Sequence, residues 1–435
     1  MIKDIVVVII RQVNLLYLDM PKVIVGMSGG VDSSVAAYLL REKGYEVEGL
    51  SFILWEKRRK ADFKTCCSLQ AVEEAAKTAQ HIGIPHLIAD VKDDFVEKVI
   101  EPFVNAYAEG STPNPCILCN RFIKFPLLIK EAEKRNAEFI ATGHYARVEP
   151  AQSAEHRAQS KNNLPTFNIQ KDFELKDLPF VTRHSLLKKG VDPKKDQSYV
   201  LYILNQEQLK KLVLPLGYYR KDEVRDIAKD LKLPAAKRAE SQEVCFVEDR
   251  NYFKFIEKLS PLAGKPGPII DMTGKVIGTH KGIHAYTIGQ RKRLGIAQKK
   301  PLYVVKIDAL KNAVYVGSQE TAKKREFYVE DLNWINPPIT PFLKKGEEGL
   351  SFKASVKVRS MMKDEPATIF LLTSDKLRVT SRVTNTYASQ VTNHESPKTV
   401  RLVFDEPQWA PASGQSAVFY NDDVVIGGGV IRIPV

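Results

Sequence analysis

The segment from Gly26 to Ser33, which reads Gly-Met-Ser-Gly-Gly-Val-Asp-Ser, constrains the fold more than any other part of this chain. The apolar run 23–25 before it predicts a buried strand, and the small and apolar residues 35–40 after it predict a helix packed on a sheet. Glycines in the turn between them adopt backbone angles that other residues avoid, and N–H groups at the helix start then point into one concavity. A strand, a glycine-rich turn and a helix in this order predict a phosphate-binding cradle.

Three polar side chains make this turn more specific than a plain glycine-rich one. Ser28 and Ser33 add hydroxyl donors for phosphate oxygens, and Asp32 is suited to hold Mg²⁺ or a water molecule on it. No lysine follows the glycines, so the turn does not match the Gly-x-x-x-x-Gly-Lys-Ser/Thr loop. It resembles the Ser-Gly-Gly-x-Asp-Ser signature of the ATP-pyrophosphatase (PP-loop) family, whose members cleave ATP to AMP and pyrophosphate. We expect the turn to bind ATP through Gly26, Met27, Ser28, Gly29, Gly30, Val31, Asp32 and Ser33.

Strand and helix patterns alternate through the first half of the chain. Strands are expected at 47–52, 85–89 and 139–142, helices at 70–82, 95–107, 125–135, 200–204 and 224–231, a loop at 110–120, and the end of a strand-like run at Leu216-Gly217. This alternation predicts an α/β domain with a parallel sheet and helices on both faces, whose ligands bind at the carboxyl ends of the strands. Both the turn 26–33 and the segment Thr142-Gly143-His144-Tyr145 leave strands at that edge.

The second half of the chain is β-rich. Closely spaced Gly and Pro residues after 251 predict a small β module, and alternating apolar residues after 325 predict an antiparallel barrel of about six strands, with a hairpin turn at Asn421-Asp422. Residues 383–397 read as an inserted loop. We expect an N-terminal extension at 1–19, a PP-loop ATP-binding catalytic domain at 20–250 with an insertion at 149–183, a central β-rich module at 251–324 and a C-terminal β-barrel domain at 325–435.

Charge and cysteine content indicate partners and compartment. The chain has 65 Lys+Arg against 52 Asp+Glu, a formal net charge of +13, which favours a polyanionic partner. Its five cysteines are an odd, sparse set in 435 residues, which predicts a reducing cytoplasm rather than a disulfide framework. No apolar stretch approaches the roughly 20 residues of a membrane span. Residues 1–19 make a poor signal peptide, and translation is as well placed to begin at Met20.

Three of the cysteines are candidates for chemistry: Cys116 and Cys119 in a CxxC pair, and Cys245 far downstream. A single CxxC pair favours structural zinc only weakly, and a thioredoxin-like redox pair lacks its helix-start setting here. A third interpretation is sulfur handling, in which one thiol carries a persulfide and a second thiol releases the sulfur by forming a disulfide. Two unrelated buried cysteines are the plain alternative.

In several short segments the chain resembles the bacterial tRNA-specific 2-thiouridylases. The matched segments are Gly-Met-Ser-Gly-Gly-Val-Asp-Ser (26–33), Thr-Pro-Asn-Pro-x-x-x-Cys-Asn (112–120), Ala-Thr-Gly-His-Tyr (141–145), Lys-Asp-Gln-Ser-Tyr (195–199), Cys-Phe (245–246), Thr-Ile-Gly-Gln-Arg (287–291) and Gly-Gln-Ser-Ala-Val (414–418). The resemblance implies a cytoplasmic enzyme that activates O2 of the tRNA wobble uridine with ATP and Mg²⁺, then replaces this oxygen with sulfur. It implies a persulfide-donating partner protein, tRNAs for Lys, Glu and Gln as substrates, and we expect a monomer.

The same resemblance implies roles for single residues. Cys245 matches the cysteine that carries the persulfide, and Cys119 matches the cysteine that releases the sulfur. Phe52 and Gly143 match positions that touch the adenosine. The positions that match tRNA contacts are Asn114, Pro115, Cys116, His144, Lys195, Asp196, Gln197, Arg359, Ser360 and Gln415.

The chain departs from the family pattern at three positions. Ser360 stands where the family usually has tyrosine, and Ser413 where it usually has proline, so Arg359 is a weaker RNA candidate. Cys116 stands where the family often has an aspartate with an acid–base role. Three cysteines, Cys116, Cys119 and Cys245, are also a ligand set for a [4Fe–4S] cluster that carries sulfide on its open iron. Both sulfur routes stay open, with the persulfide relay preferred.

Two other classes of function compete with this interpretation. One is a different PP-loop enzyme, an amidotransferase or ligase that acts on a small molecule, against which the three cysteines and the barrel argue. The other is a non-catalytic RNA-binding protein with a relic cradle, against which the intact Ser28, Asp32 and Ser33 argue.

Overall fold

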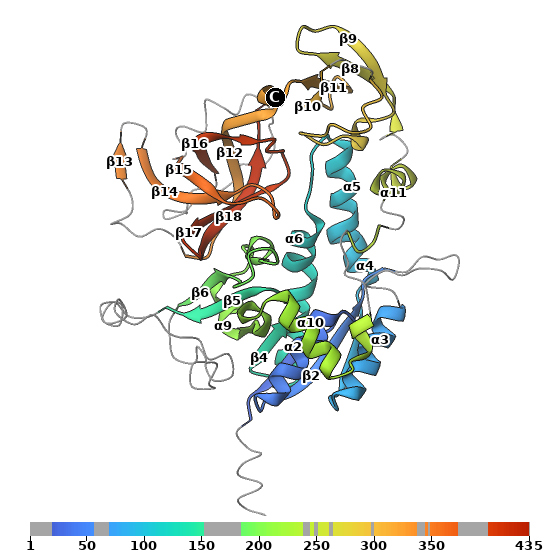
Figure 1. Ribbon diagram of the computed structural model, residues 1–435, viewed down its shortest axis with the longest axis vertical. Helices are drawn as coiled ribbons and strands as arrows, with labels where there is room; N and C mark the ends of the chain where they lie inside the picture. Colours follow the sequence, from blue (N-terminus) through green and yellow to red (C-terminus); the bar gives the residue numbers. More distant parts are fainter. Residues whose placement is uncertain are drawn as a thin grey trace, which may run out of the picture. The chain divides into compact units, whose positions relative to one another are not determined.

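The chain separates into two compact units, each assembled from stretches that lie far apart in the sequence. The first unit contains residues 1–93, 121–198 and 206–246, and the second contains 94–120, 199–205 and 247–435. The computed structural model (Figure 1) describes residues 20–55, 69–151, 184–237, 244–247, 251–260, 264–296, 300–336, 344–346, 349–372 and 399–434. The predicted extension at 1–19, most of the insertion at 149–183, the loop at 383–397, and Cys66 with Cys67 lie outside the described residues.

The first unit is built on a five-stranded parallel sheet with the strand order β3-β2-β1-β4-β7. Its strands are β1 (Lys22–Gly26), β2 (Glu46–Ile53), β3 (His86–Asp90), β4 (Phe139–Thr142) and β7 (Leu212–Val213). Its helices are α2 (Val31–Glu42), α3 (Leu69–His81), α7 (Phe125–Lys134), α9 (Gln206–Lys211) and α10 (Lys221–Asp230), with 3₁₀ turns at Pro215–Tyr218 and Pro234–Lys237. The predicted parallel sheet is confirmed by these strand pairings. Continuous apolar runs such as Val23 to Val25 form its strands because both faces of the sheet are buried.

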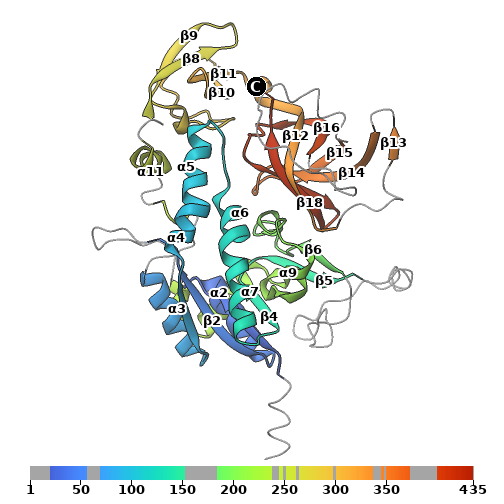
Figure 2. The same ribbon diagram turned by 180° about the vertical axis from the view of Figure 1, so that it is seen from behind.

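Alternate residues of the central strand pack on opposite layers of helices. Val23 and Val25 belong to a core that includes the apolar residues of α2, α3 and α10. Gly26, two residues along from Ile24, faces Leu128 of α7 on the other side of the sheet. Figure 2 shows α7 running beside β4 and α3 beside β2. The sheet is therefore covered on both faces, and its carboxyl edge is where the turn at 26–30 leaves β1.

An antiparallel hairpin of β5 (Ala146–Pro150) and β6 (Ser185–Lys189) completes the described part of the first unit. The sequence patterns did not predict these strands, because the polar segment between them hides their pairing. The helix predicted at 200–204 was wrong, since a short 3₁₀ turn occupies Ser198–Val200. The strand-like run predicted to end at Leu216-Gly217 was also wrong in type, because strand β7 ends at Val213 and the 3₁₀ turn follows.

The second unit contains a helical stem, a small sheet and a barrel. The helical segments are α4 (Lys92–Phe95, which begins in the first unit), the π-helical turn at Val96–Ile100, α5 (Glu101–Ala108), α6 (Pro115–Cys119), α11 (Tyr252–Leu259), α12 (Gln319–Ala322) and a 3₁₀ turn at Ile283–Ala285. A second π-helical turn (Asn120–Lys124) joins α6 to α7 across the boundary between the units. The small sheet has the order β10-β11-β8-β9, from β8 (Gly267–Asp271), β9 (Val276–His280), β10 (Tyr303–Asp308) and β11 (Ala313–Gly317). The expected β-rich central module is thus present.

A closed antiparallel barrel forms the rest of the second unit, as predicted. Its strands are β12 (Lys323–Trp334), β14 (Gly349–Lys357), β15 (Glu365–Leu371), β16 (Thr399–Trp409), β17 (Ser416–Asn421) and β18 (Val424–Arg432), with β13 (Lys344–Gly346) paired to β14. The order β12-β16-β15-β14-β17-β18 closes because β12 also pairs with β18. The predicted hairpin joins β17 to β18, and Asp422 in its turn has φ 54°.

No helix among the described residues is both long enough and apolar enough to cross a membrane.

Candidate active site

The turn after β1 has the geometry of an anion cradle. Gly29 has φ +72°, which favours glycine, and Gly30 precedes α2 without a side chain to cap it. The Ser33 hydroxyl bonds the Ser28 N–H at 3.1 Å and lies 3.3 Å from the Ser28 Oγ. The two serine hydroxyls and the N-terminus of α2 therefore surround one small space, which suits a phosphate group.

Gly143 brings strand β4 against the same helix start. A Cβ at this position would lie 2.7 Å from the Ser33 nitrogen and 2.8 Å from the Asp32 carbonyl carbon. Only a glycine allows this approach of two backbones. The sequence match placed Gly143 at the adenosine, and its contact with the cradle accounts for glycine here on steric grounds.

Asp32 accepts two hydrogen bonds that the sequence did not reveal. Its Oδ1 atom receives the Tyr145 hydroxyl at 2.7 Å and the Lys221 Nζ at 2.5 Å. The Lys221 side chain is only 8% exposed, whereas the Asp32 side chain is 36% exposed. Lys221 begins α10, which packs on α2, so a residue 189 positions downstream brings a cation to the turn.

The Lys-Asp-Gln-Ser-Tyr segment holds Tyr145 in place. The Gln197 side chain accepts a hydrogen bond from the Tyr145 N–H at 2.9 Å, and the Gln197 N–H donates to the Tyr145 carbonyl at 2.8 Å. Asp196 is buried and accepts from the Ser198 N–H and hydroxyl and from the Gly190 N–H. Both side chains thus have structural partners, while Lys195 is partly exposed.

His144 is held as a neutral ring. Its Nδ1 lies 2.8 Å from the Thr142 hydroxyl, and the ring stacks on Phe125 at 6.1 Å between centroids. Burial, with the positive charge of Lys124 as a second cause, lowers the pKa of His144 to about 3. The residue predicted to contact tRNA therefore carries no charge near neutral pH.

Phe52 lies near the carboxyl end of β2, one strand away from the cradle. Its neighbour Ser51 donates to the Met27 carbonyl at 2.7 Å and lies 2.9 Å from His86 Nε2. These contacts fix the start of the turn, and Phe52 itself is half-buried.

The CxxC pair lies on a helix, so the predicted loop at 110–120 was wrong in its second half. Helix α6 begins at Pro115, and the Asn114 side chain caps it by accepting from the Cys116 N–H at 3.1 Å. Cys116 is exposed in the first turn and Cys119 is buried at the end. The helix-start setting that the sequence lacked is therefore present, and proline at the first helical position is the signal that indicated it.

Ser413 and Gln415, which precede strand β17 of the barrel, hold the residues before this helix. The Gln415 side chain donates to the Thr112 carbonyl at 2.9 Å, and the Thr112 N–H donates to the Ser413 carbonyl at 2.8 Å. Asn120, at the end of α6, donates to the Val200 carbonyl at 3.1 Å. The helix with the two thiols is thus fixed at both ends within the second unit.

Arg359 is partly buried within the second unit. Its Nη2 donates to the carbonyls of Ile288 at 3.0 Å and Ala410 at 2.7 Å. Burial lowers its pKa, while Tyr199 and Tyr107 act in the opposite direction. This side chain therefore ties the Thr-Ile-Gly-Gln-Arg segment to the barrel, and its neighbour Ser360 is half-buried.

Metal ligands do not gather among the described residues. Within them, no group of three or more His, Cys, Asp or Glu side chains is arranged to hold an ion. Three cysteines for an iron–sulfur cluster are thus not assembled there, and Cys245 is half-buried in the short described stretch 244–247. Asp32 beside the cradle does suit Mg²⁺, which is commonly bound by one carboxylate, phosphate oxygens and water.

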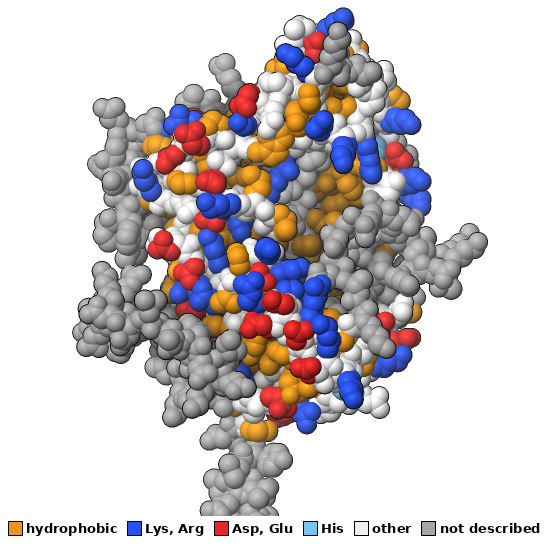
Figure 3. Space-filling model, viewed as in Figure 1, with side chains coloured by type: hydrophobic (Ala, Val, Ile, Leu, Met, Phe, Trp, Pro, Cys, Tyr) orange, Lys and Arg blue, Asp and Glu red, His pale blue; other side chains and the backbone are white. Residues whose placement is uncertain are grey.

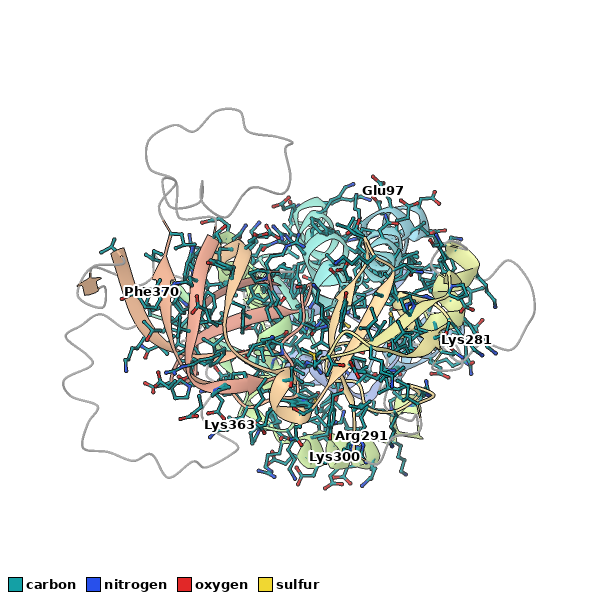
Figure 4. The ribbon with its side chains drawn as sticks, turned by 90° about the horizontal axis from the view of Figure 1, so that it is seen from above. Glu97, Lys281, Arg291, Lys300, Lys363 and Phe370 are labelled. Carbon is teal, nitrogen blue, oxygen red and sulfur yellow. The ribbon has the colours of Figure 1, made fainter. Side chains whose placement is uncertain are left out.

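Basic side chains are spread over the surface. On the face in Figure 3, Lys and Arg side chains are interspersed with Asp and Glu. Figure 4 shows Lys281, Arg291, Lys300 and Lys363 pointing outward from the second unit, where all four are exposed. These residues are available to an anionic partner.

Comparison with known proteins identifies the whole architecture. Family models match residues 21–249 as a "tRNA methyl transferase HUP domain", 254–318 as its "PRC-barrel domain" and 376–431 as an "aminomethyltransferase beta-barrel domain". The chain is 42% identical over 414 residues to tRNA-specific 2-thiouridylase MnmA 2 of Thermoanaerobacter sp. (strain X514), covering 94% of this chain and 98% of that protein. It is 40% identical over 412 residues to the MnmA of Clostridioides difficile (strain 630), again covering 94% and 98%. On the cradle, the thiol helix and this nearly full-length similarity, the chain belongs to the MnmA family of tRNA-specific 2-thiouridylases.

Proposed function

We propose that this protein is an ATP-dependent tRNA-uridine 2-sulfurtransferase, which converts the wobble uridine to 2-thiouridine. The observation that carries the proposal is the intact cradle of Ser28, Asp32 and Ser33 at the carboxyl edge of the parallel sheet, in a chain that also presents a thiol-bearing helix. The N–H groups of α2 and the two hydroxyls bind the phosphates of ATP.

The first chemical step is adenylation of the uridine. The C2 carbonyl oxygen attacks the α-phosphorus of ATP, the bond to the β-phosphate oxygen breaks, and pyrophosphate leaves with its electron pair into the cradle. Asp32 would hold Mg²⁺, which would neutralise phosphate charge in this step. AMP on O2 turns a poor leaving group into a good one.

The second step is sulfur transfer. The terminal sulfur of a Cys245 persulfide attacks C2 and AMP departs. The Cys119 thiolate then attacks the Cys245 sulfur, so the transferred sulfur stays on C2 and a Cys119–Cys245 disulfide forms. The two thiols supply the two electrons that reduce the sulfane sulfur, and a cellular thiol reductant must reopen the disulfide.

A partner protein with a persulfide supplies the sulfur, and tRNAs for Lys, Glu and Gln are the substrates in this proposal. The enzyme acts as a cytoplasmic monomer. The tRNA contacts are expected from Asn114, Pro115, Cys116, His144, Lys195, Asp196, Gln197, Arg359, Ser360 and Gln415. Several of these side chains have structural partners, so we expect them to act on RNA mainly through the backbone that they position.

The direct test combines the chain, ATP, a persulfide source and unmodified tRNA, followed by mass analysis of the nucleosides. We expect 2-thiouridine and AMP, and we expect Cys245→Ser and Cys119→Ser to abolish the thiolated product. A fully active Cys245→Ser enzyme would refute the role of this residue.

Cys116→Asp separates the two sulfur routes. This change installs the residue that the family often carries, so a persulfide relay keeps its activity. A cluster held by three thiolates loses one ligand, and both activity and bound iron would fall. Iron measured after anaerobic purification is the independent readout.

Methyl transfer is the competing function, because the matching family model is named for it. A cradle for phosphate and a pair of thiols serve no step of a simple methyl transfer. The same nucleoside analysis tests this alternative, since a methylated uridine and a thiolated uridine differ in mass.

A further inference from the structure

We infer that Lys221 is the phosphate-binding cation of this site, and that it exchanges its ion pair with Asp32 for the β- and γ-phosphates when ATP binds. The inference rests on the proposed use of ATP and adds a residue to it. A triphosphate brings several negative charges into the cradle, yet the turn itself contains no lysine or arginine from Gly26 to Ser34.

Lys221 occupies a position that is unfavourable for a cation. It is the first residue of α10, where the positive end of the helix disfavours a cation. Its side chain is 8% exposed, so its ammonium has lost most of its hydration. Its N–H donates to Asp192 at 3.0 Å, and its Nζ lies over the Tyr145 ring at 5.6 Å from the centroid.

Asp32 is the temporary partner. Its Oδ1 receives both the Lys221 ammonium and the Tyr145 hydroxyl, which orients the carboxylate at the start of α2. Asp32 is also the acidic residue placed to hold Mg²⁺ at the cradle. As the nucleotide arrives with its metal, the lysine gains phosphate oxygens in place of a carboxylate, and the long side chain needs only rotamer changes to follow.

The plain alternative is that Lys221 only neutralises Asp32 and never touches the nucleotide. The two roles predict different ligand selectivity. A lysine that binds the β- and γ-phosphates contributes to the affinity for ATP and pyrophosphate. It contributes little to the affinity for AMP, whose single phosphate is the α-phosphate. If the lysine is purely structural, replacing it changes the affinities for AMP and ATP equally, or changes neither.

The test measures calorimetric binding of a non-hydrolysable ATP analogue, pyrophosphate and AMP, all with Mg²⁺ and without tRNA. We expect Lys221→Met to weaken the analogue and pyrophosphate by about 10-fold or more, the range of a charge-assisted hydrogen bond, with AMP within about 2-fold. Lys221→Arg keeps the charge and should recover part of the loss. Lys229→Met, on the exposed face of the same helix, is the matched control and should bind all three ligands normally.

Equal weakening of AMP, or unchanged binding of the analogue, would overturn the inference. If Lys221→Met does not fold, the wild-type enzyme gives the answer through an acyl-phosphate derivative of ATP, which acylates lysines at its phosphates. Peptide mass analysis should find the label on Lys221, blocked by excess ATP, and an unlabelled Lys221 would refute the proposal. Because tRNA and sulfur are absent, a protein that binds ATP as described but makes no 2-thiouridine would contradict the proposed function alone.

Discussion

Single residues of the cradle have little freedom to change, because backbone or packed side chains lie directly against them. Gly143 lies against the Ser33 nitrogen, and His144 beside it is confined between Thr142 and Phe125. Gly143 is constrained by steric contact, and His144 is constrained by burial that keeps its ring neutral. The two positions therefore need different experiments.

Gly143→Ala should damage both stability and nucleotide binding. Its Cβ would lie 2.7 Å from the Ser33 nitrogen, and a forced shift in packed backbone costs about 1–3 kcal/mol of unfolding free energy. Urea unfolding and titration with an ATP analogue measure the two effects. Gly264→Ala is the control, because its Cβ would meet only the Glu257 Cγ, at 3.9 Å. Wild-type affinity in Gly143→Ala would show that the helix start is free to move.

His144→Asn should flatten the dependence of stability on acid. The folded ring has a pKa of about 3, whereas the unfolded chain protonates it near the ordinary value of about 6.5. Below about pH 6.5 the unfolded state binds more protons, so the free energy of unfolding falls as pH falls, by about 1 kcal/mol from pH 6.5 to 5.5. Urea unfolding of both proteins over this range should show a smaller loss in the variant, and equal losses would contradict a neutral His144.

At the scale of elements, the sequence predicted the strands and helices that have a regular pattern of apolar residues. The parallel sheet and the barrel follow from runs such as Val23 to Val25 and from alternation in the last hundred residues. Helix α6 was missed because prolines and asparagine read as a loop, although Pro115 at the first position and Asn114 as the cap are helix signals.

The missed site residue has a similar explanation. Lys221 stands in the strongly charged sequence of α10, where lysines normally face solvent. Its burial depends on the packing of α10 against α2, which no local pattern reveals. The absence of a lysine from the turn was the one available clue.

Gln197 makes two hydrogen bonds to the Tyr145 backbone. Replacing Gln197 should therefore affect nucleotide binding even in the absence of RNA. Gln197→Leu removes the acceptor for the Tyr145 N–H and should weaken an ATP analogue about 3- to 10-fold, because Tyr145 orients Asp32. Gln197→Glu keeps an acceptor oxygen and should bind nearly normally. If Gln197 serves only tRNA, both variants will bind the analogue like the wild type.

At the scale of the whole molecule, neither compact unit is a continuous stretch of chain. Residues 94–120 and 199–205 belong with the C-terminal half, although the residues around them belong to the first unit. The polypeptide therefore connects the units at several points, in contrast to domains joined by one linker.

A chain truncated after residue 250 should fail to fold cooperatively. It keeps the parallel sheet but leaves α5 and α6 without the partners that they have in residues 247–435. We expect a broad thermal transition, binding of a hydrophobic dye and rapid proteolysis within 94–120. A sharp transition with native resistance to protease would show that the sheet domain is independent.

The hydrogen bond from Gln415 to the Thr112 carbonyl joins residues 303 positions apart. A ribosome that adds about 5–20 residues per second needs about 15–60 s to make the second partner after the first. During that interval the nascent polypeptide exposes the stretch before Cys116 and Cys119 without its final support. A fragment released early by a stalled ribosome would therefore contain Cys116 and Cys119 but not the residue that anchors the chain before them, so only finished copies would hold Cys119 in place to release the sulfur.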